Sequence, residues 1–386
     1  MKRTKIAGTV ALGAAALMVF SACSSPTDSS EASVDEPAAT AEESVAEQPT
    51  EEASEEPEVE PSEAETEDSP IAQTLAFMDS GVKPEPGLKI AYLTECVNNP
   101  YCGARLQGLE EAAAEYGMEV QVFDADFNPQ TQLTQVQDAI QQGFDGYIFM
   151  PVADAPGCSA FELLQETGQP VATGNSPMCG NQDFTEGSIG MAAMQTEQFF
   201  QDHVENAFAS CEGECQAMAV GGYLGSDLFT RWQNAIQKAA AKYPNVTVVV
   251  DQPGDFDPGT ALQLTQDALQ ANPDISIIVS SWDDMTRGVE QGVEAAGKIP
   301  GEDVRIYSVG GTAEAANRIR DGRWNGTSIL LPYEESYFPV VHLARFFANG
   351  EETPGFTNLA EAPTVTDGPG SVYLDQQNID TFTPQY

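Results

Sequence analysis

Residues 126–148 read DFNPQTQLTQVQDAIQQGFDGYI, and residues 255–277 read DFDPGTALQLTQDALQANPDISI. Aligned without a gap, at an offset of 129 residues, 11 of these 23 positions are identical. A solenoid would repeat every 20 to 50 residues or so. A single recurrence at this larger spacing instead indicates two similar halves. Two similar lobes leave a cleft between them, and clefts are where small ligands bind.

Each copy of the repeat has the signature of a helix that begins after a short loop. Asn128 and Asp257 can act as N-caps, because a short side-chain oxygen accepts the free amide protons of the first turn. Pro129 and Pro258 then stand at the first helical position, where a missing N–H costs nothing. Apolar residues recur at helical spacing, and each helix leads into an apolar run typical of a buried strand. Two unrelated amphipathic helices would not share the Asp-Phe-x-Pro-x-Thr opening, so we favour a duplication.

The first 23 residues are expected to be a lipoprotein signal peptide. A basic start is followed by an apolar run over residues 6–20 that is short for a membrane span. Phe20-Ser21-Ala22-Cys23 resembles a bacterial lipobox, with Phe where Leu is usual, so Cys23 is the expected lipidation site. Ordinary cleavage, with Cys23 unmodified, is the alternative. A lipid anchor would place the protein at the outer face of a membrane.

Residues 24–70 are strongly acidic and are expected to form a disordered tether. They contain 17 acidic residues and no Lys or Arg, so they cannot bury enough apolar surface to offset chain entropy. Residues 71–386 still carry a net charge of about −30. Nucleic acid is therefore excluded as a partner, because its binding depends on Lys and Arg at phosphates.

Six cysteines remain once Cys23 is assigned to the lipid. In an exported chain they predict three disulfides, although the sequence allows about 15 pairings. The simplest pairing joins neighbours: Cys96 with Cys102, Cys158 with Cys179, and Cys211 with Cys215. Metal binding is the rival interpretation. The spacings lack CxxC pairs and the chain has 2 histidines, so we expect no metal site.

From residue 88 onwards, apolar strands alternate with amphipathic helices. This alternation predicts an α/β fold with parallel sheets covered on both faces. The expected strands are 88–94, 118–126, 147–152, 170–175, 216–222, 246–252, 277–281, 305–310, 327–332 and 371–374. Besides the two repeat helices, helices are expected over 104–117, 231–243, 285–296 and 342–348, and after residues 154 and 312.

The loops after these strands show no catalytic motif. They contain no G-x-S-x-G elbow, no P-loop and no GxGxxG. His203 and His342 are the two histidines, and both fall inside expected helices. The sequence therefore predicts neither an enzyme nor a bound cofactor.

The loops instead carry aromatic, amide and charged side chains at strand ends, where ligands bind in parallel sheets. Rings pack against the C–H faces of a polyhydroxylated solute, and polar groups pair with its hydroxyls. Taken singly, Phe256 also suits a core position and Arg231 a surface charge, so their shared placement after strands carries the interpretation. The candidate ligand-binding residues are Glu95, Asn99, Tyr101, Asn175, Arg231, Phe256, Trp282 and Asp283.

Several segments resemble type I periplasmic sugar-binding proteins, the ribose-binding relatives that serve ABC importers. They are residues 89–152 with the Asn-Asn-Pro-aromatic loop at 98–101, Arg231, DQPGDFDPG at 251–259, and Trp-Asp-Asp-Met at 282–285. The resemblance covers roughly residues 88–386 and implies two Rossmann-like lobes joined by three hinge crossings. It implies an N-terminal lobe of 88–188 plus 331–360 and a C-terminal lobe of 189–330 plus 361–386. It also implies that Asn99, Tyr101, Asn175, Arg231, Phe256 and Trp282 contact the ligand, with Glu95 beside them.

The sequence departs from the ribose-binding pattern at four places. Asn175-Ser176 replaces an Asp-Arg pair, Val309-Gly310 replaces an acid, Leu330 replaces a polar residue, and Met150 replaces an Asn. The pocket is therefore expected to be less charged and more apolar than one made for a simple pentose. We expect its ligand to be a modified sugar, a polyol or a partly apolar solute.

The sequence thus predicts a lipid-anchored, non-catalytic receptor at the extracytoplasmic face of a bacterial membrane. It would capture a sugar-like solute between two lobes and deliver it to an ABC permease. The alternative is a sensor of the same fold that signals to a membrane kinase; neighbouring permease or kinase genes would discriminate the two. An extracellular enzyme is disfavoured by the missing nucleophile–base pair, and a LacI-type repressor by the signal sequence and the acidity.

Overall fold

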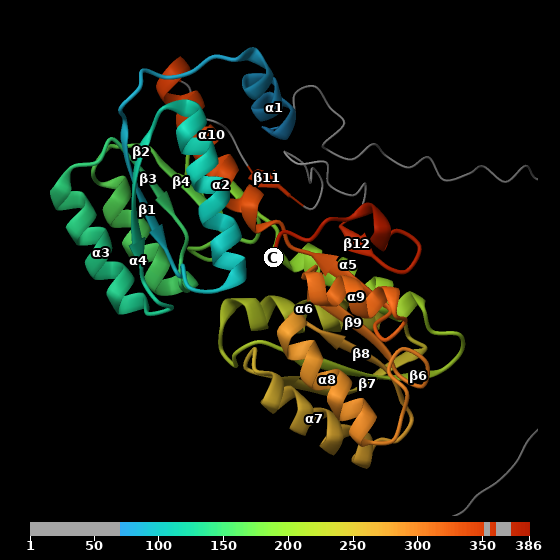
Figure 1. The fold of residues 1–386 in the computed structure, drawn as a ribbon. Coiled ribbons are helices and arrows are strands. Elements are labelled where there is room, and N and C mark those ends of the chain that lie inside the picture. Colours follow the sequence, from blue (N-terminus) through green and yellow to red (C-terminus); the bar gives the residue numbers. More distant parts are fainter. Residues whose placement is uncertain (1–69, 351–355, 360–371) are drawn as a thin grey trace, which may run out of the picture. The chain divides into compact units, whose positions relative to one another are not determined.

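The computed structural model describes residues 70–350, 356–359 and 372–386 (Figure 1). The expected signal peptide with Cys23 and the acidic segment up to residue 69 lie outside the described residues. So do residues 351–355 and 360–371 of the expected lobes. Among the helices that are described, none combines the length and the apolar character of a membrane span.

The first sheet consists of parallel strands in the order β11-β5-β4-β3-β1-β2. Its strands are β1 (Lys89–Thr94), β2 (Glu119–Asp124), β3 (Gly146–Phe149), β4 (Val171–Asn175), β5 (Gly190–Ala193) and β11 (Phe356–Asn358). The helices of this part are α1 (Pro70–Ser80), α2 (Pro100–Tyr116), α3 (Pro129–Gln142), α4 (Asp154–Gln165) and α10 (Pro332–Asn349).

The second sheet has the order β12-β10-β9-β8-β6-β7, in which only β12 is antiparallel to its neighbour among the described strands. Its strands are β6 (Cys215–Gly221), β7 (Val246–Pro253), β8 (Ile275–Ser280), β9 (Arg305–Gly310), β10 (Gly326–Ile329) and β12 (Tyr373–Leu374). The helices are α5 (Glu197–Ala209), α6 (Asp227–Lys242), α7 (Pro258–Ala271), α8 (Asp283–Ala295), α9 (Ala313–Arg320) and the 3-10 helix Ile379–Thr381. Apart from the edge strands β11 and β12, the two sheets share one strand order. The predicted α/β class with two lobes is confirmed, and the shared strand order agrees with the predicted duplication.

The two copies of the repeat fold alike down to the backbone. The Asn128 Oδ1 accepts the Thr131 N–H at 2.9 Å, and the Asp257 Oδ1 accepts the Thr260 N–H at 2.7 Å, so the predicted N-caps of α3 and α7 are confirmed. The two residues before each cap adopt positive φ, which is uncommon outside glycine. They are Asp126 (48°), Phe127 (55°), Asp255 (55°) and Phe256 (51°).

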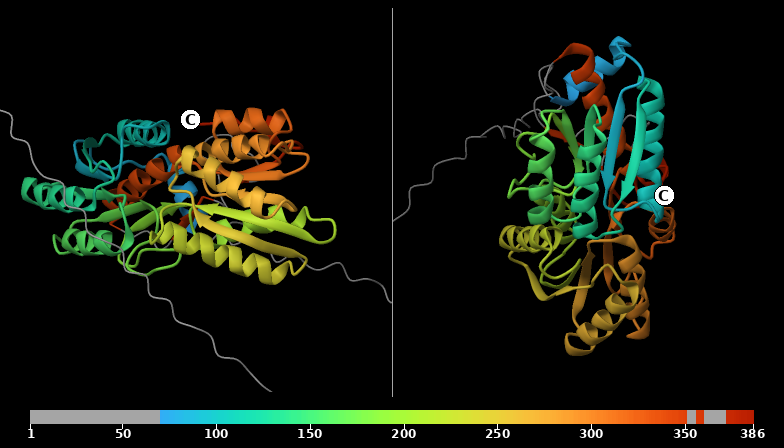
Figure 2. Two further views of the ribbon diagram at one scale, coloured as in Figure 1. Left: turned by 90° about the horizontal axis from the view of Figure 1, so that it is seen from below. Right: turned by 90° about the vertical axis from the view of Figure 1, so that its left-hand side faces the viewer.

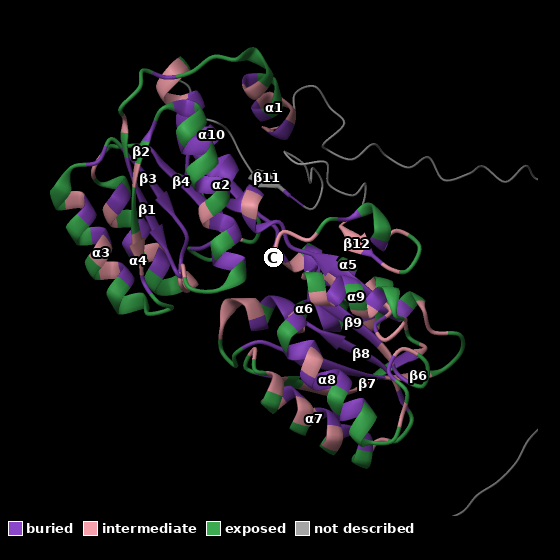
Figure 3. Ribbon diagram, viewed as in Figure 1, coloured by how far each residue is buried: buried purple, intermediate pink, exposed green. Residues whose placement is uncertain are grey.

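Helices cover both faces of each sheet, and the central strands between them are buried (Figures 2 and 3). A strand points alternate side chains to opposite faces, so an apolar run serves two cores at once. In β1, Ile90 and Tyr92 pack with α2 and α10, whereas Ala91 and Leu93 pack with α3 and α4. This two-sided burial explains why the strands read as continuous apolar runs.

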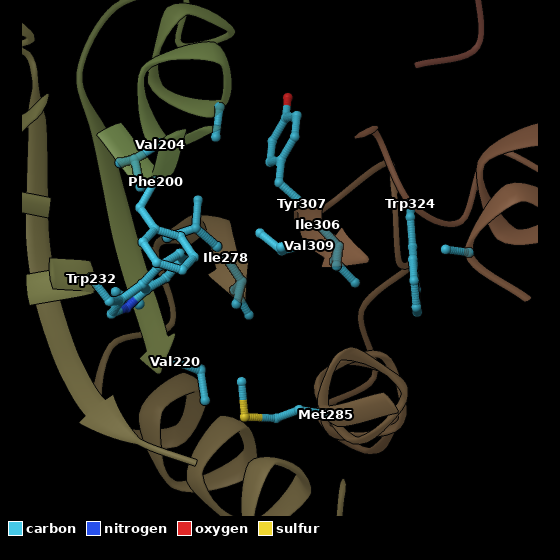
Figure 4. Close-up of a cluster of buried hydrophobic side chains, with 14 of the residues drawn as sticks. Phe200, Val204, Val220, Trp232, Ile278, Met285, Ile306, Tyr307, Val309 and Trp324 are labelled. Carbon is cyan, nitrogen blue, oxygen red and sulfur yellow. The ribbon is translucent and has the colours of Figure 1, made fainter. Parts of the chain in front are cut away.

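Trp232 of α6 lies in the core of the second lobe (Figure 4). Its side chain is fully buried, and the Phe200 ring of α5 meets it edge to face with ring centroids 5.7 Å apart. Ile278 of β8 and Met285 of α8 belong to the same cluster. Each such fully buried apolar side chain stabilises the fold by about 1.5–3 kcal/mol.

Three disulfides join neighbouring cysteines, which is the simplest of the pairings that the sequence allowed. Their Cα–Cα distances are within the range usual for disulfides. They are Cys96–Cys102 (5.9 Å), Cys158–Cys179 (4.9 Å) and Cys211–Cys215 (6.1 Å).

Several expected elements and boundaries differ in the structure: α1, β5 and β11 were not predicted, and α2 and α6 begin before residues 104 and 231. The first sheet continues past residue 188, because β5 pairs with β4 and β11 and reaches Ala193. The sequence of β5, GMAA, has no β-branched or aromatic residue to mark it as a strand. The helix expected over 342–348 begins at Pro332, because proline is well tolerated in a first helical turn.

Candidate functional site

Aromatic side chains from the strand ends of the two sheets meet. Tyr101 lies in the first turn of α2, just after β1, and Trp282 immediately precedes α8, just after β8. Their ring centroids are 5.8 Å apart, with an edge-to-face angle of 76°. The structure therefore brings together two candidates that are far apart in sequence.

Glu95 and Asn175 are also brought together, at the ends of β1 and β4. The Asn175 Nδ2 donates to the Glu95 Oε1 at 2.8 Å, and the Thr94 hydroxyl donates to the other carboxylate oxygen at 3.1 Å. Gln195 in turn donates to the Asn175 Oδ1 at 3.0 Å. Both candidates thus form part of a connected polar network that orients them.

Arg105 is the centre of this network, and the sequence analysis did not identify it. Its guanidinium donates to Glu95 and lies 5.5 Å from the centre of the Tyr101 ring. Its spacing of four residues from Tyr101 on α2 was the available signal, because such residues share a helix face. The Arg105 side chain therefore contacts two of the candidate residues, Glu95 and Tyr101.

Glu335, near the start of α10, is a second residue that sequence reasoning missed. The Tyr101 hydroxyl donates to the Glu335 Oε2 at 2.6 Å, and the Arg105 Nε lies 3.6 Å from the same oxygen. Burial raises the pKa of Glu335 to about 7. No local pattern could reveal this residue, because 234 positions separate it from Tyr101.

Asn99 caps α2 instead of projecting free polar atoms. Its Oδ1 accepts the Cys102 N–H at 2.8 Å, and its Nδ2 points to the Cys96 sulfur at 3.8 Å. The Cys96–Cys102 disulfide spans the same turn. Asn99 is therefore held in place at an exposed position beside Tyr101.

Arg231 links the second lobe to the first. Its Nη2 donates to the Pro177 carbonyl at 2.9 Å, while its Nη1 is buried and finds no partner among the described residues. Burial lowers the pKa of this guanidinium. From the same helix, Asp227 accepts the Asp154 N–H at 2.8 Å. A buried donor without a partner in the protein is a natural contact for a ligand.

Phe256 and Asp283 occupy different surroundings. The Phe256 ring packs edge to face on Tyr223, with ring centroids 5.3 Å apart, in the loop after β7. Asp283 is buried, and its carboxylate accepts from the Ser308 hydroxyl at 2.5 Å and from the Thr312 N–H at 2.8 Å. Burial raises the pKa of Asp283 to about 6. Asp283, the residue after Trp282, thus holds the β9–α9 connection in place.

Tyr386 is the third residue that sequence analysis did not anticipate. Its ring lies 5.4 Å from that of Tyr101 and 6.3 Å from that of Trp282. No sequence motif indicates it, and the segment that carries it has no regular secondary structure. The aromatic cluster therefore consists of three rings.

The two histidines lie away from these side chains, inside the cores. Burial lowers the pKa of His203 and of His342 to about 3, so both are neutral at physiological pH. The His203 Nδ1 is 3.0 Å from the Ser328 hydroxyl. In the part of the chain that the structure describes, no three His, Cys, Asp or Glu side chains gather as metal ligands would.

A hollow of about 550 Å³ lies elsewhere, between α8, α9 and Arg323. Its charged side chains pair with one another, as Arg318 does with Glu290 at 3.4 Å and Arg287 with Glu314 at 3.3 Å. It contains none of the candidate ligand-binding residues. We interpret it as a salt-bridged surface of the second lobe.

Comparisons with known proteins agree on one family. The model of the periplasmic binding protein domain matches residues 90–352. The ribose import binding protein RbsB of Escherichia coli (strain K12) is 25% identical over 246 residues, covering 63% of this chain and 79% of that protein. RbsB of Bacillus subtilis (strain 168) is 26% identical over 268 residues, covering 66% and 79%. The fold is similar to that of an ABC transporter solute binding protein from Bacillus halodurans C-125 with bound myo-inositol. The TM-score is 0.65 and the sequence identity 18%, and the match covers 78% of this chain and 99% of that one.

Proposed function

This chain belongs to the periplasmic binding protein domain family, and we propose that it is an extracytoplasmic protein that captures a sugar or polyol for an ABC importer. One observation carries the proposal: Tyr101 and Trp282 follow strands of different sheets, yet their rings lie 5.8 Å apart. Aromatic faces contributed by both lobes are suited to the C–H faces of a sugar-like solute. A solute bound there would hold the two lobes together.

Buried polar atoms near the starts of α6 and α10 support a ligand rich in hydroxyls. Among the described residues, the Arg231 Nη1 is a buried donor without a partner, and the Glu335 Oε1 is a buried acceptor without one. A hydroxyl can accept from the first kind of group and donate to the second. The relatives named above include proteins for ribose and myo-inositol, which are ligands of this chemical class.

We further propose that binding occurs without chemical conversion. The carboxylates of Glu95 and Asp283 already accept hydrogen bonds within the protein, and the two histidines are buried in the cores. A general base must instead lie within hydrogen-bond reach of the proton that it removes. Lipidation at Cys23 completes the proposal, since it would tether the receptor beside a membrane importer.

The experiment is calorimetric titration of the purified protein with ribose, myo-inositol and, as a non-sugar control, glycine. We expect wild-type protein to bind at least one of the two polyhydroxylated solutes and not glycine. Arg231→Met should weaken that binding roughly ten- to hundredfold, because a hydrogen bond to a charged group contributes about 1.5–3 kcal/mol.

Arg287→Met on α8 is the matched control, because its side chain is 42% exposed and lies in the salt-bridged hollow. This variant should bind as the wild-type protein does. Absence of binding to either solute, or equal affinities of the wild-type and Arg231→Met proteins, would refute the proposed function.

A further inference from the structure

Gln385 and Tyr386 are hydrogen-bonded to three elements beside the aromatic cluster. The Gln385 side chain accepts from the Tyr333 N–H at 3.1 Å and donates to the Glu334 Oε2 at 2.6 Å, both at the start of α10. The Tyr386 carbonyl accepts from the Ala313 N–H at 3.0 Å, at the start of α9. The Tyr386 hydroxyl donates to the Gly310 carbonyl at 2.8 Å, at the end of β9. Side chain and backbone together hold this segment in one position.

The ring of Tyr386 leaves no room for a solute inside the aromatic cluster. Tyr386 and Tyr101 are 5.4 Å apart at 84°, Tyr386 and Trp282 are 6.3 Å apart at 20°, and Tyr101 and Trp282 are 5.8 Å apart at 76°. A sugar ring sandwiched between two aromatic rings needs them about 7–8 Å apart, twice the contact distance between carbon atoms. A bound solute must therefore lie against the outside of this cluster, and Tyr386 occupies space that the solute cannot use.

Gly310 explains why a side chain from another segment fills this place. Its φ is 148°, and an added Cβ would lie 2.5 Å from the Asp283 Oδ2, so no other residue fits there without displacing the buried carboxylate. At the end of β9, the Gly310 carbonyl accepts from the Leu330 N–H at 2.9 Å and, with no side chain beside it, can take a second donor. The hydroxyl of Tyr386 covers it and brings an aromatic ring to the end of this strand.

We propose that Tyr386 is a specificity-determining residue of the solute site, forming a fixed wall that limits the ligand to a single small ring or a short polyol. This inference rests on the proposed function, since it concerns the same site. The alternative is that Tyr386 is a plug, a side chain that occupies the place of the solute itself. The two roles predict opposite effects of removing the Tyr386 side chain. Removing a wall weakens the binding of a small solute and admits a larger one, whereas removing a plug strengthens the binding of a small solute.

Tryptophan fluorescence provides the assay. The chain has 3 tryptophans, and Trp232 and Trp324 are fully buried in the core of the second lobe. A change on ligand addition therefore reports on Trp282, which stacks beside Tyr386. Wild-type protein, Tyr386→Ala and Tyr386→Phe are titrated with ribose, myo-inositol and the disaccharide maltose. Thermal unfolding confirms that each variant is folded.

For Tyr386→Ala we expect about tenfold weaker binding of the small solute and measurable binding of maltose, which wild-type protein excludes. Tyr386→Phe keeps the ring and should retain the wild-type preference. Stronger or unchanged binding of the small solute by Tyr386→Ala, or maltose binding by wild-type protein, would overturn the role of Tyr386 and leave the proposed function standing. If wild-type protein binds neither ribose nor myo-inositol, the proposed function fails and this inference fails with it.

Discussion

Replacing Glu335 by Gln should remove one pH-dependent contribution to the stability of the protein. Glu335 is fully buried, and burial raises its pKa from 4.5 to about 7. Between these two values the folded protein keeps a proton that the unfolded chain releases. The contribution of Glu335 to the free energy of unfolding is therefore greatest below about pH 4.5, decreases as the pH rises, and is constant above about pH 7.

The size of this effect follows from the pKa difference. Each pKa unit corresponds to about 1.4 kcal/mol, so the whole decrease is of the order of 3 kcal/mol. Glutamine carries no titratable proton but keeps an oxygen that can accept from the Tyr101 hydroxyl, now 2.6 Å from the Glu335 Oε2. Glu335→Gln should therefore be destabilising or neutral at pH 5 and gain most of the 3 kcal/mol relative to wild type at pH 8.

Urea unfolding of both proteins at several pH values between 4.5 and 8 measures this difference. Glu110→Gln, at an exposed position on α2, controls for the loss of one surface carboxylate. Both proteins keep the other titrating groups, among them Asp283, whose pKa burial raises to about 6, and His203 and His342, whose pKa burial lowers to about 3. The difference between the two proteins at each pH therefore isolates Glu335. If the free energies of wild type and Glu335→Gln run parallel across this pH range, burial does not govern the titration of Glu335 and the reasoning is wrong.

Two further predictions concern packing and anchoring. Gly288→Ala should lower the free energy of unfolding by about 1–3 kcal/mol, because its Cβ would overlap the Pro258 carbonyl at the start of α7. Urea unfolding checks this against Gly103→Ala on α2, where an added Cβ meets no atom within 4 Å, and equal costs would contradict it. Cys23→Ala should move the protein from the membrane fraction to the soluble extracytoplasmic fraction, as cell fractionation with immunoblotting would show. A variant that stays with the membrane would exclude Cys23 as the anchor.

Much of the fold could be predicted because its signals are local. The capping residues Asn128 and Asp257 lie next to the helices that they begin, and the structure confirms both. The apolar strand runs were readable because residues on both faces of the central strands are buried. The short strand β5 was missed, since four small or flexible residues carry no strand signal and its pairing with β4 decides its structure.

The candidate site was only partly predictable. Tyr101 and Trp282 were identified because each follows a strand, and parallel sheets present such positions at one edge. Arg105 and Glu335 lie inside helices, where a charged residue normally faces solvent. Both are nevertheless buried, because the Arg105 guanidinium pairs with the Glu95 carboxylate and lies 3.6 Å from the Glu335 carboxyl group.

The sequence by itself determined the repeated half, the alternation of strands and helices, and the positions of the loops after the strands. These features depend on residues that are close to one another in the sequence, so local patterns are enough to predict them. Two features were decided by the tertiary structure alone. Glu335 accepts a hydrogen bond from the Tyr101 hydroxyl, and Tyr386 forms an aromatic cluster with Tyr101 and Trp282. Those contacts join segments more than 100 residues apart, and only the packing of the sheets and helices brings such segments into contact.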